Sequence, residues 1–76
     1  MLKGTRDAIL KKMQPVSIHG QVSWDISFND IDDPDAQPHV ARVGPEAIVG
    51  RNMEPGDRIQ VEYVVGVVVK VTRVVP

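Results

Sequence analysis

The chain of 76 residues contains no cysteine, and its only aromatic side chains besides histidine are one Trp, one Tyr and one Phe. Without cysteine, neither a disulfide framework nor a thiolate zinc site can stabilise the fold. No segment approaches the roughly 20 apolar residues of a membrane-spanning helix, and the first residues lack the apolar stretch of a signal peptide. We therefore expect a cytoplasmic protein with no membrane partner.

The chain also lacks an excess of charge of either sign, because nine Lys and Arg residues face ten Asp and Glu residues. A domain that holds nucleic acid mainly by bulk electrostatics usually carries a clear basic excess, so any such binding here would need a local patch of cations. A chain this short buries only about 60% of its unfolded surface. It has room for a single domain, to whose stability a partner or a second copy would add.

The valine-rich segment 58–75 is the strongest structural signal that is present. A turn signal at residues 53–57 precedes it, and Gly66 divides it into two runs of β-branched residues, which predicts a hairpin over 58–65 and 67–75. Alternate residues of a strand share one face, so one parity is expected to face the core. That set is Ile59, Val61, Tyr63, Val65, Val67, Val69 and Val71.

Residues 16–28 also alternate between apolar and polar side chains, which predicts a long strand. The apolar members are Val16, Ile18, Val22, Trp24, Ile26 and Phe28. Gly20 is expected to bend this segment, into two strands or one coiled strand, so that it serves two sides of a barrel. A turn-rich acidic loop over 29–37, a strand over 38–43 and a helical turn over 44–50 would follow.

The first residues favour a short helix that ends before Pro15. Thr5 is a good N-cap, Asp7 lies in the first turn, and Lys11 and Lys12 lie in the last turn, where the helix dipole favours cations. Ile9, Leu10 and Met13 would form its apolar stripe. The predicted fold is therefore mainly β: a helix over 1–14 packs on a closed or nearly closed five-stranded barrel over 15–76, with a helical turn between strands three and four.

This order of elements is the layout of the oligonucleotide-binding (OB) barrel. His19-Gly20-Gln21-Val22-Ser23-Trp24 resembles the cold-shock-domain opening K-G-x-V-K-W, and residues 53–61 resemble the L-x-E-G-x-x-V-x-F of that family. The resemblance implies binding of single-stranded RNA or DNA, with Trp24 at the position of a stacking tryptophan. The aromatic motifs K-G-F-G-F-I and F-V-H have no counterpart, and Arg42 stands at the Phe of F-V-H.

The candidate nucleic-acid site combines Trp24 with Arg42, Arg58 and Lys70. Trp24 shares parity with core residues, so it either packs inward or forms a stacking platform. The three cations fall on the opposite parity and would form a strip facing phosphates, or else an ordinary solvated face. With so few stacking residues, we expect weak binding of single strands.

The alternative function is a protein-interaction or self-associating module. Val64, Val68 and Val74 fall on the parity opposite the core, where polar residues are expected, and would dock a protein partner or form a homodimer unless the N-terminal helix covers them. We expect no enzyme, no cofactor and no metal site. The acidic loop lacks the glycine and glutamate of an EF-hand, and the two histidines have no base and orienting group arranged beside them.

Overall fold

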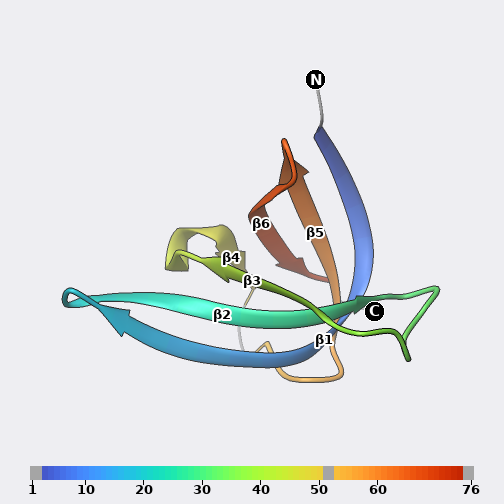
Figure 1. Cartoon of the computed structure of the whole chain (residues 1–76), viewed down its shortest axis with the longest axis horizontal. Coiled ribbons are helices and arrows are strands. Elements are labelled where there is room, and N and C mark those ends of the chain that lie inside the picture. The colour runs from blue at the N-terminus through green and yellow to red at the C-terminus, as the bar shows by residue number, and fades with distance from the viewer. Residues whose placement is uncertain (1–2, 51–52, 75–76) are drawn as a thin grey trace.

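A computed structural model describes residues 3–50 and 53–74. The described chain is mainly β, with six strands in one sheet and no α-helix (Figure 1). The elements are β1 (Lys3–Ile18), β2 (Gln21–Asp30), β3 (His39–Val43), the 3-10 helix η1 (Pro45–Ala47), β4 (Ile48–Val49), β5 (Arg58–Val64) and β6 (Val67–Arg73). The helical turn after the third strand is confirmed, whereas the expected count of five strands is wrong.

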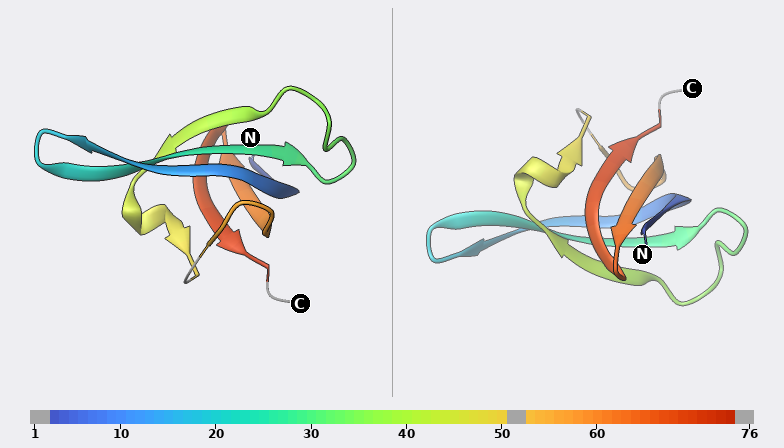
Figure 2. Two further views of the ribbon diagram at one scale, coloured as in Figure 1. Left: turned by 90° about the horizontal axis from the view of Figure 1, so that it is seen from below. Right: turned by 90° about the horizontal axis from the view of Figure 1, so that it is seen from above.

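The sheet curls into an open half-barrel. Its strand order is β3-β2-β1-β5-β6-β4, and every pairing is antiparallel except the short parallel pair of β4 with β6. The edge strand β3 and strand β6 approach each other, yet no ladder joins them in the described part of the chain (Figure 2). This arrangement is compatible with an OB-like fold in which the last seam stays open.

The predicted N-terminal helix is wrong, because residues 3–18 form the longest strand of the sheet. The first half of β1 pairs with β5 from Lys3 to Ile9, and the second half pairs with β2 from Ala8 to Ile18. The register shifts between Leu10 and Lys12, as at a β-bulge. A bulge bends a strand, and β1 turns there from the direction of β5 to that of β2 (Figure 1).

Burial explains why pairing overrides the helical signals. Ala8 and Leu10 are fully buried in the core cluster, and Met13 packs against it from beyond the bulge. A short helix is marginal in water by itself, whereas this strand completes two ladders and buries alternate side chains. The caps and end charges of a helix are each worth only about 1 kcal/mol, so they do not decide the structure.

Gly20 does not bend a single strand but closes a hairpin between β1 and β2. His19 and Gly20 both have positive φ, 51° and 79°, between the paired residues Ile18 and Gln21. Two consecutive positive φ values fit a two-residue type I′ turn, whose twist matches that of the flanking strands. The expected strand over 16–28 is therefore the end of β1, a turn, and β2.

Pro15 lies inside β1, opposite Trp24, instead of ending a helix. Ile18 and Gln21 flank a two-residue turn and so form a hydrogen-bonded pair; alternation along the ladder then makes Pro15 and Trp24 a non-hydrogen-bonded pair. The backbone nitrogen of Pro15, which has no N–H, thus points away from β2. On that side of β1 the pairing with β5 ends at Ile9, so Pro15 lies at an edge of the sheet. Proline is tolerated at such an edge and discourages further pairing there.

The core lies between the two halves of the curled sheet. Its fully buried side chains are Ala8, Leu10, Ile26, Phe28, Ile59, Val61 and Val71. The parity predicted for the β5–β6 hairpin holds for Ile59, Val61 and Val71 but fails near the turn, where Val65, Val67 and Val69 are exposed. A register shift after Glu62 leaves Val69 without a partner and brings Val68 opposite Tyr63, inward against the core.

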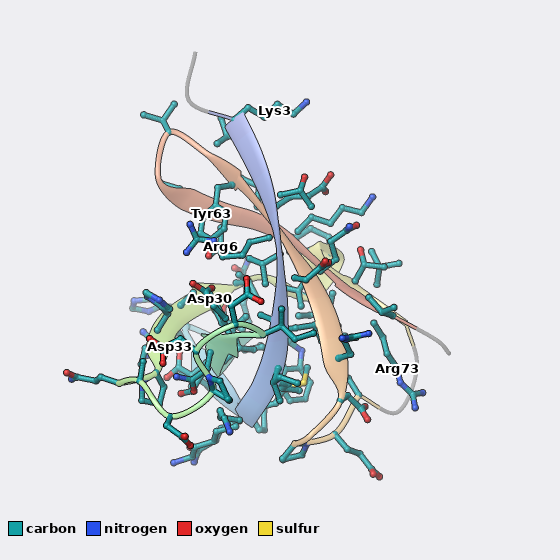
Figure 3. The ribbon with its side chains drawn as sticks, turned by 90° about the vertical axis from the view of Figure 1, so that its right-hand side faces the viewer. Lys3, Arg6, Asp30, Asp33, Tyr63 and Arg73 are labelled. Carbon is teal, nitrogen blue, oxygen red and sulfur yellow. The ribbon has the colours of Figure 1, made fainter. Side chains whose placement is uncertain are left out.

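Asn29 fixes the acidic loop that follows β2. Its side chain is 1% exposed, and its Nδ2 donates a hydrogen bond of 2.6 Å to the carbonyl oxygen of Ala36. Nearby, the Arg6 guanidinium pairs with Asp30 at 3.0 Å and lies 5.9 Å from the centre of the Tyr63 ring (Figure 3). The described residues include no helix long and apolar enough to cross a membrane.

Candidate binding surface on the β1–β2 arm

The outer part of the β1–β2 hairpin, residues 12–25, projects from the half-barrel, and we call it the arm (Figures 1 and 2). β3 pairs with β2 only as far as Trp24, so the arm is a two-stranded ribbon beyond that residue. Ile26 is buried in the core, so the residues that share its face of the ribbon are its cross-strand partner and the alternate residues outward. These are Met13, Pro15, Ser17, Val22 and Trp24. The opposite face carries Lys12, Gln14 and Asp25 near the base, and Val16 and Ile18 beside Ser23 and Gln21 toward the tip. The base of the arm is therefore amphipathic.

A pocket of about 380 Å³ opens at the base of the apolar face of the arm. We call it the arm pocket, and it is lined by Met13, Trp24, Pro45, Ile48, Gly50, Met53 and Pro55. Proteins commonly hold ligands in mostly apolar pockets of about 300–1,000 Å³. No lining side chain carries a charge, so this pocket suits an apolar group and not an ion.

Three chain segments build the arm pocket. The hairpin supplies Met13 and Trp24, and η1 with β4 supplies Pro45 and Ile48 from the far side. The turn before β5 supplies Met53 and Pro55, and it is held against β1 by a hydrogen bond of 2.7 Å from Gly56 N–H to the carbonyl oxygen of Leu10. The walls are thus anchored to the core while the pocket itself stays open.

Trp24 lies on the inner side of the sheet, half-buried against the core and in the arm pocket. Methionine is adaptable and contacts aromatic rings favourably, so Met13 and Met53 beside Trp24 can adjust to the shape of an inserted group. The sequence pattern placed Trp24 correctly on the core parity. It gave no signal for Met53, Ile48 or Pro55, because these come together only through the tertiary fold.

The predicted cations do not gather around Trp24. Arg42 pairs across the ladder with Asp25, with Nε and Nη2 donating bonds of 2.7 and 3.0 Å to the carboxylate. This hydrogen bonding, with the attraction between the two opposite charges, lowers the pKa of Asp25 and raises that of Arg42. Arg58 and Lys70 are exposed on β5 and β6, and Lys70 lies opposite Glu62.

The three valines predicted as an interaction surface lie at separate places. Val64 stands between Lys3 and Val67 near one end of the β5–β6 hairpin, and Val68 packs against the core. Val74 lies beyond β6, where its N–H donates to the carbonyl oxygen of Arg58. The structure does not bring them into one patch.

A second opening lies between the unjoined strands β3 and β6. Its lining includes Phe28, His39, Val40, Tyr63 and Val67, around about 360 Å³. The rings of His39 and Phe28 are 5.6 Å apart, and Val40 and Val67 are 73% and 62% exposed. Burial, as the main cause, raises the pKa of the Tyr63 hydroxyl. This opening is more polar than the arm pocket.

Comparison with protein-family models, curated proteins and solved structures finds no match to this chain. Within residues 3–50 and 53–74, no three His, Asp or Glu side chains are grouped so that they could hold a metal ion.

Proposed function

We propose that the protein is a non-enzymatic interaction module that binds an apolar part of a protein partner on the arm. The observation that carries this proposal is the apolar face of the ribbon, which leads from exposed Val22 and Pro15 into the arm pocket at Trp24. Apolar surface that continues into an open pocket is typical of interaction sites, whereas singly scattered apolar residues are not.

The composition of the surface supports a protein partner. Interface centres are poor in charge and rich in aromatic residues and Met, with a polar rim. The arm pocket contains Trp24 and two methionines, and its surroundings include Ser23 and Glu46 near the same ribbon. A buried aromatic anchor in an apolar setting is the usual source of binding energy at such sites.

Binding of 1-anilinonaphthalene-8-sulfonate, a probe of exposed apolar surface, tests whether this pocket accepts an apolar group. Trp24 is the only tryptophan, so energy transfer from it to the probe reports binding near the pocket. We expect Met53→Gln to weaken this transfer several-fold and the control Val40→Gln, on β3, to leave it unchanged. Absence of transfer in the wild type, or equal loss in both variants, would refute the proposal.

Single-stranded nucleic-acid binding remains a second candidate, favoured by the OB-like strand order and by exposed Arg58 and Lys70. The cold-shock resemblance belongs to this candidate. It predicts weak, salt-sensitive binding through the outer face, because phosphate contacts dominate such affinity. Titration of nitrogen-15-labelled protein with oligo-dT and oligo-U at low salt tests it: shifts confined to Arg42, Arg58 and Lys70 would support it, and no shifts would reject it.

A further inference from the structure

The tip of the arm is apolar on both faces. Val22 belongs to the face that leads to the arm pocket, whereas Val16 and Ile18 lie on the opposite face, beside Ser23 and Gln21. Val22 and Ile18 are 48% and 38% exposed. An isolated two-stranded ribbon is at best marginally stable in water. Water surrounds the end of such a ribbon, so polar residues would be expected there. Apolar side chains there indicate a tip that is covered by something apolar.

The same chain contains a suitable receptor for that tip. Met13 marks the arm pocket and Ile18 marks the tip, and a strand rises about 3.3 Å per residue, so about 16 Å separates them along β1. A tip cannot fold back into the pocket at its own base over this distance. Two arms lying antiparallel, however, place each tip at the pocket of the other.

We propose that the partner is a second copy of this chain, joined by reciprocal insertion of each arm tip into the arm pocket of the other copy. Such an arrangement has two-fold symmetry and closes on itself, because each copy gives and receives the same contact. The net charge of −1 gives little repulsion between copies. This inference rests on the proposed function, since it names the occupant of the same pocket.

Sedimentation velocity of the full chain from micromolar to millimolar concentration gives the first test. The arms offer a small interface, and small interfaces are weak, so we expect a reversible monomer–dimer equilibrium, with Trp24 emission shifting to shorter wavelength as the dimer forms. A monomer at all concentrations would overturn the inference. If that monomer still bound the sulfonate probe in the arm pocket, the proposed function would stand.

A complementation experiment tests the tip and the pocket separately. A tip variant, Ile18→Lys with Val22→Lys, and a pocket variant, Met53→Lys, should each raise the dimer dissociation constant at least tenfold. Mixed together they should associate more tightly than either alone, because one intact tip meets one intact pocket. Both carry lysine, so they gain no mutual attraction. A mixture no tighter than the separate variants would overturn the inference.

Two further variants keep this test independent of folding. Pro55→Lys changes an exposed residue at the rim of the arm pocket, so it replaces Met53→Lys if that variant loses the dichroism of the wild type. Val40→Lys removes the most exposed of the large apolar side chains of the described surface, and Val40 belongs neither to the tip nor to the lining of the arm pocket. It should leave the dissociation constant unchanged, and a tenfold increase there would show general hydrophobic association instead.

Discussion

Replacing Val65 by asparagine should stabilise the protein. Val65 and Gly66 form the two-residue turn between β5 and β6, with φ values of 51° and 77°. Positive φ at both positions fits a type I′ turn, for which Asn-Gly is a strongly preferred sequence. A β-branched residue in this region is a genuine outlier, so Val65 holds a strained backbone that asparagine would relieve.

The expected size of the effect follows from strain and burial. The left-handed region costs an ordinary residue about 1–2 kcal/mol. The side chain of Val65 is 65% exposed, so little apolar contact is lost on substitution, at most about 1 kcal/mol at roughly 25 cal/mol per Å². The net gain should be about 0.5–1 kcal/mol, which raises the melting temperature of a chain this size by about 2–8 °C.

Val67→Asn is the matched control. Val67 is 62% exposed, nearly as much as Val65, but it is the first residue of β6 and pairs with Val64. It should lose about 0.5–1 kcal/mol, because asparagine disfavours strands and no strain is relieved. Urea denaturation of both variants with the wild type measures the difference, which should be at least about 1 kcal/mol. Equal destabilisation by the two substitutions would refute a strained turn at Val65.

Three further predictions concern a core leucine, the asparagine that anchors the acidic loop, and the titration of Tyr63. Leu10→Ala should cost about 2–5 kcal/mol in urea denaturation, and half-buried Ile9→Ala much less; similar costs would contradict the alternation of β1. Asn29→Ala should cost about 1–3 kcal/mol and speed amide exchange in the 31–38 loop, and an unchanged loop would contradict its anchoring role. The pKa of Tyr63 should lie above the usual value of about 10 in the folded protein, measured by phenolate absorbance of the only tyrosine. Since the unfolded chain then loses this proton first, stability should fall as pH rises through 10; equal folded and unfolded midpoints would contradict the burial.

The sequence was informative where a side-chain period continues without interruption. Residues 58–64 and 39–43 form strands as predicted, and Gly66 marks the turn between β5 and β6. Gly20 is a turn glycine as well, but the apolar parity of Ile18 continues at Val22, which left one bent strand as an alternative to two strands. Only the cross-strand pairing shows that these residues lie on opposite faces of a hairpin.

Bulges account for most of what could not be predicted. Ala8, Leu10 and Met13 all face inward, but the bulge separates Leu10 from Met13 by three positions instead of two, which mimics the spacing of a helix face. The bulge at Val69 likewise moves Val68 inward and exposes Val67. The arm pocket could not be predicted from the sequence either, because the residues that line it are far apart in the sequence and belong to no motif.

Proton–proton contacts in solution show whether residues 3–18 form a strand whose outer half builds the apolar arm. Non-hydrogen-bonded antiparallel pairs bring their Cα atoms to about 4.5 Å. We expect strong nuclear Overhauser effects between the Hα atoms of Pro15 and Trp24 and between those of Met13 and Ile26. Contacts between Hα of residue i and the amide proton of residue i+3 over residues 5–13, with neither cross-strand effect, would contradict this strand.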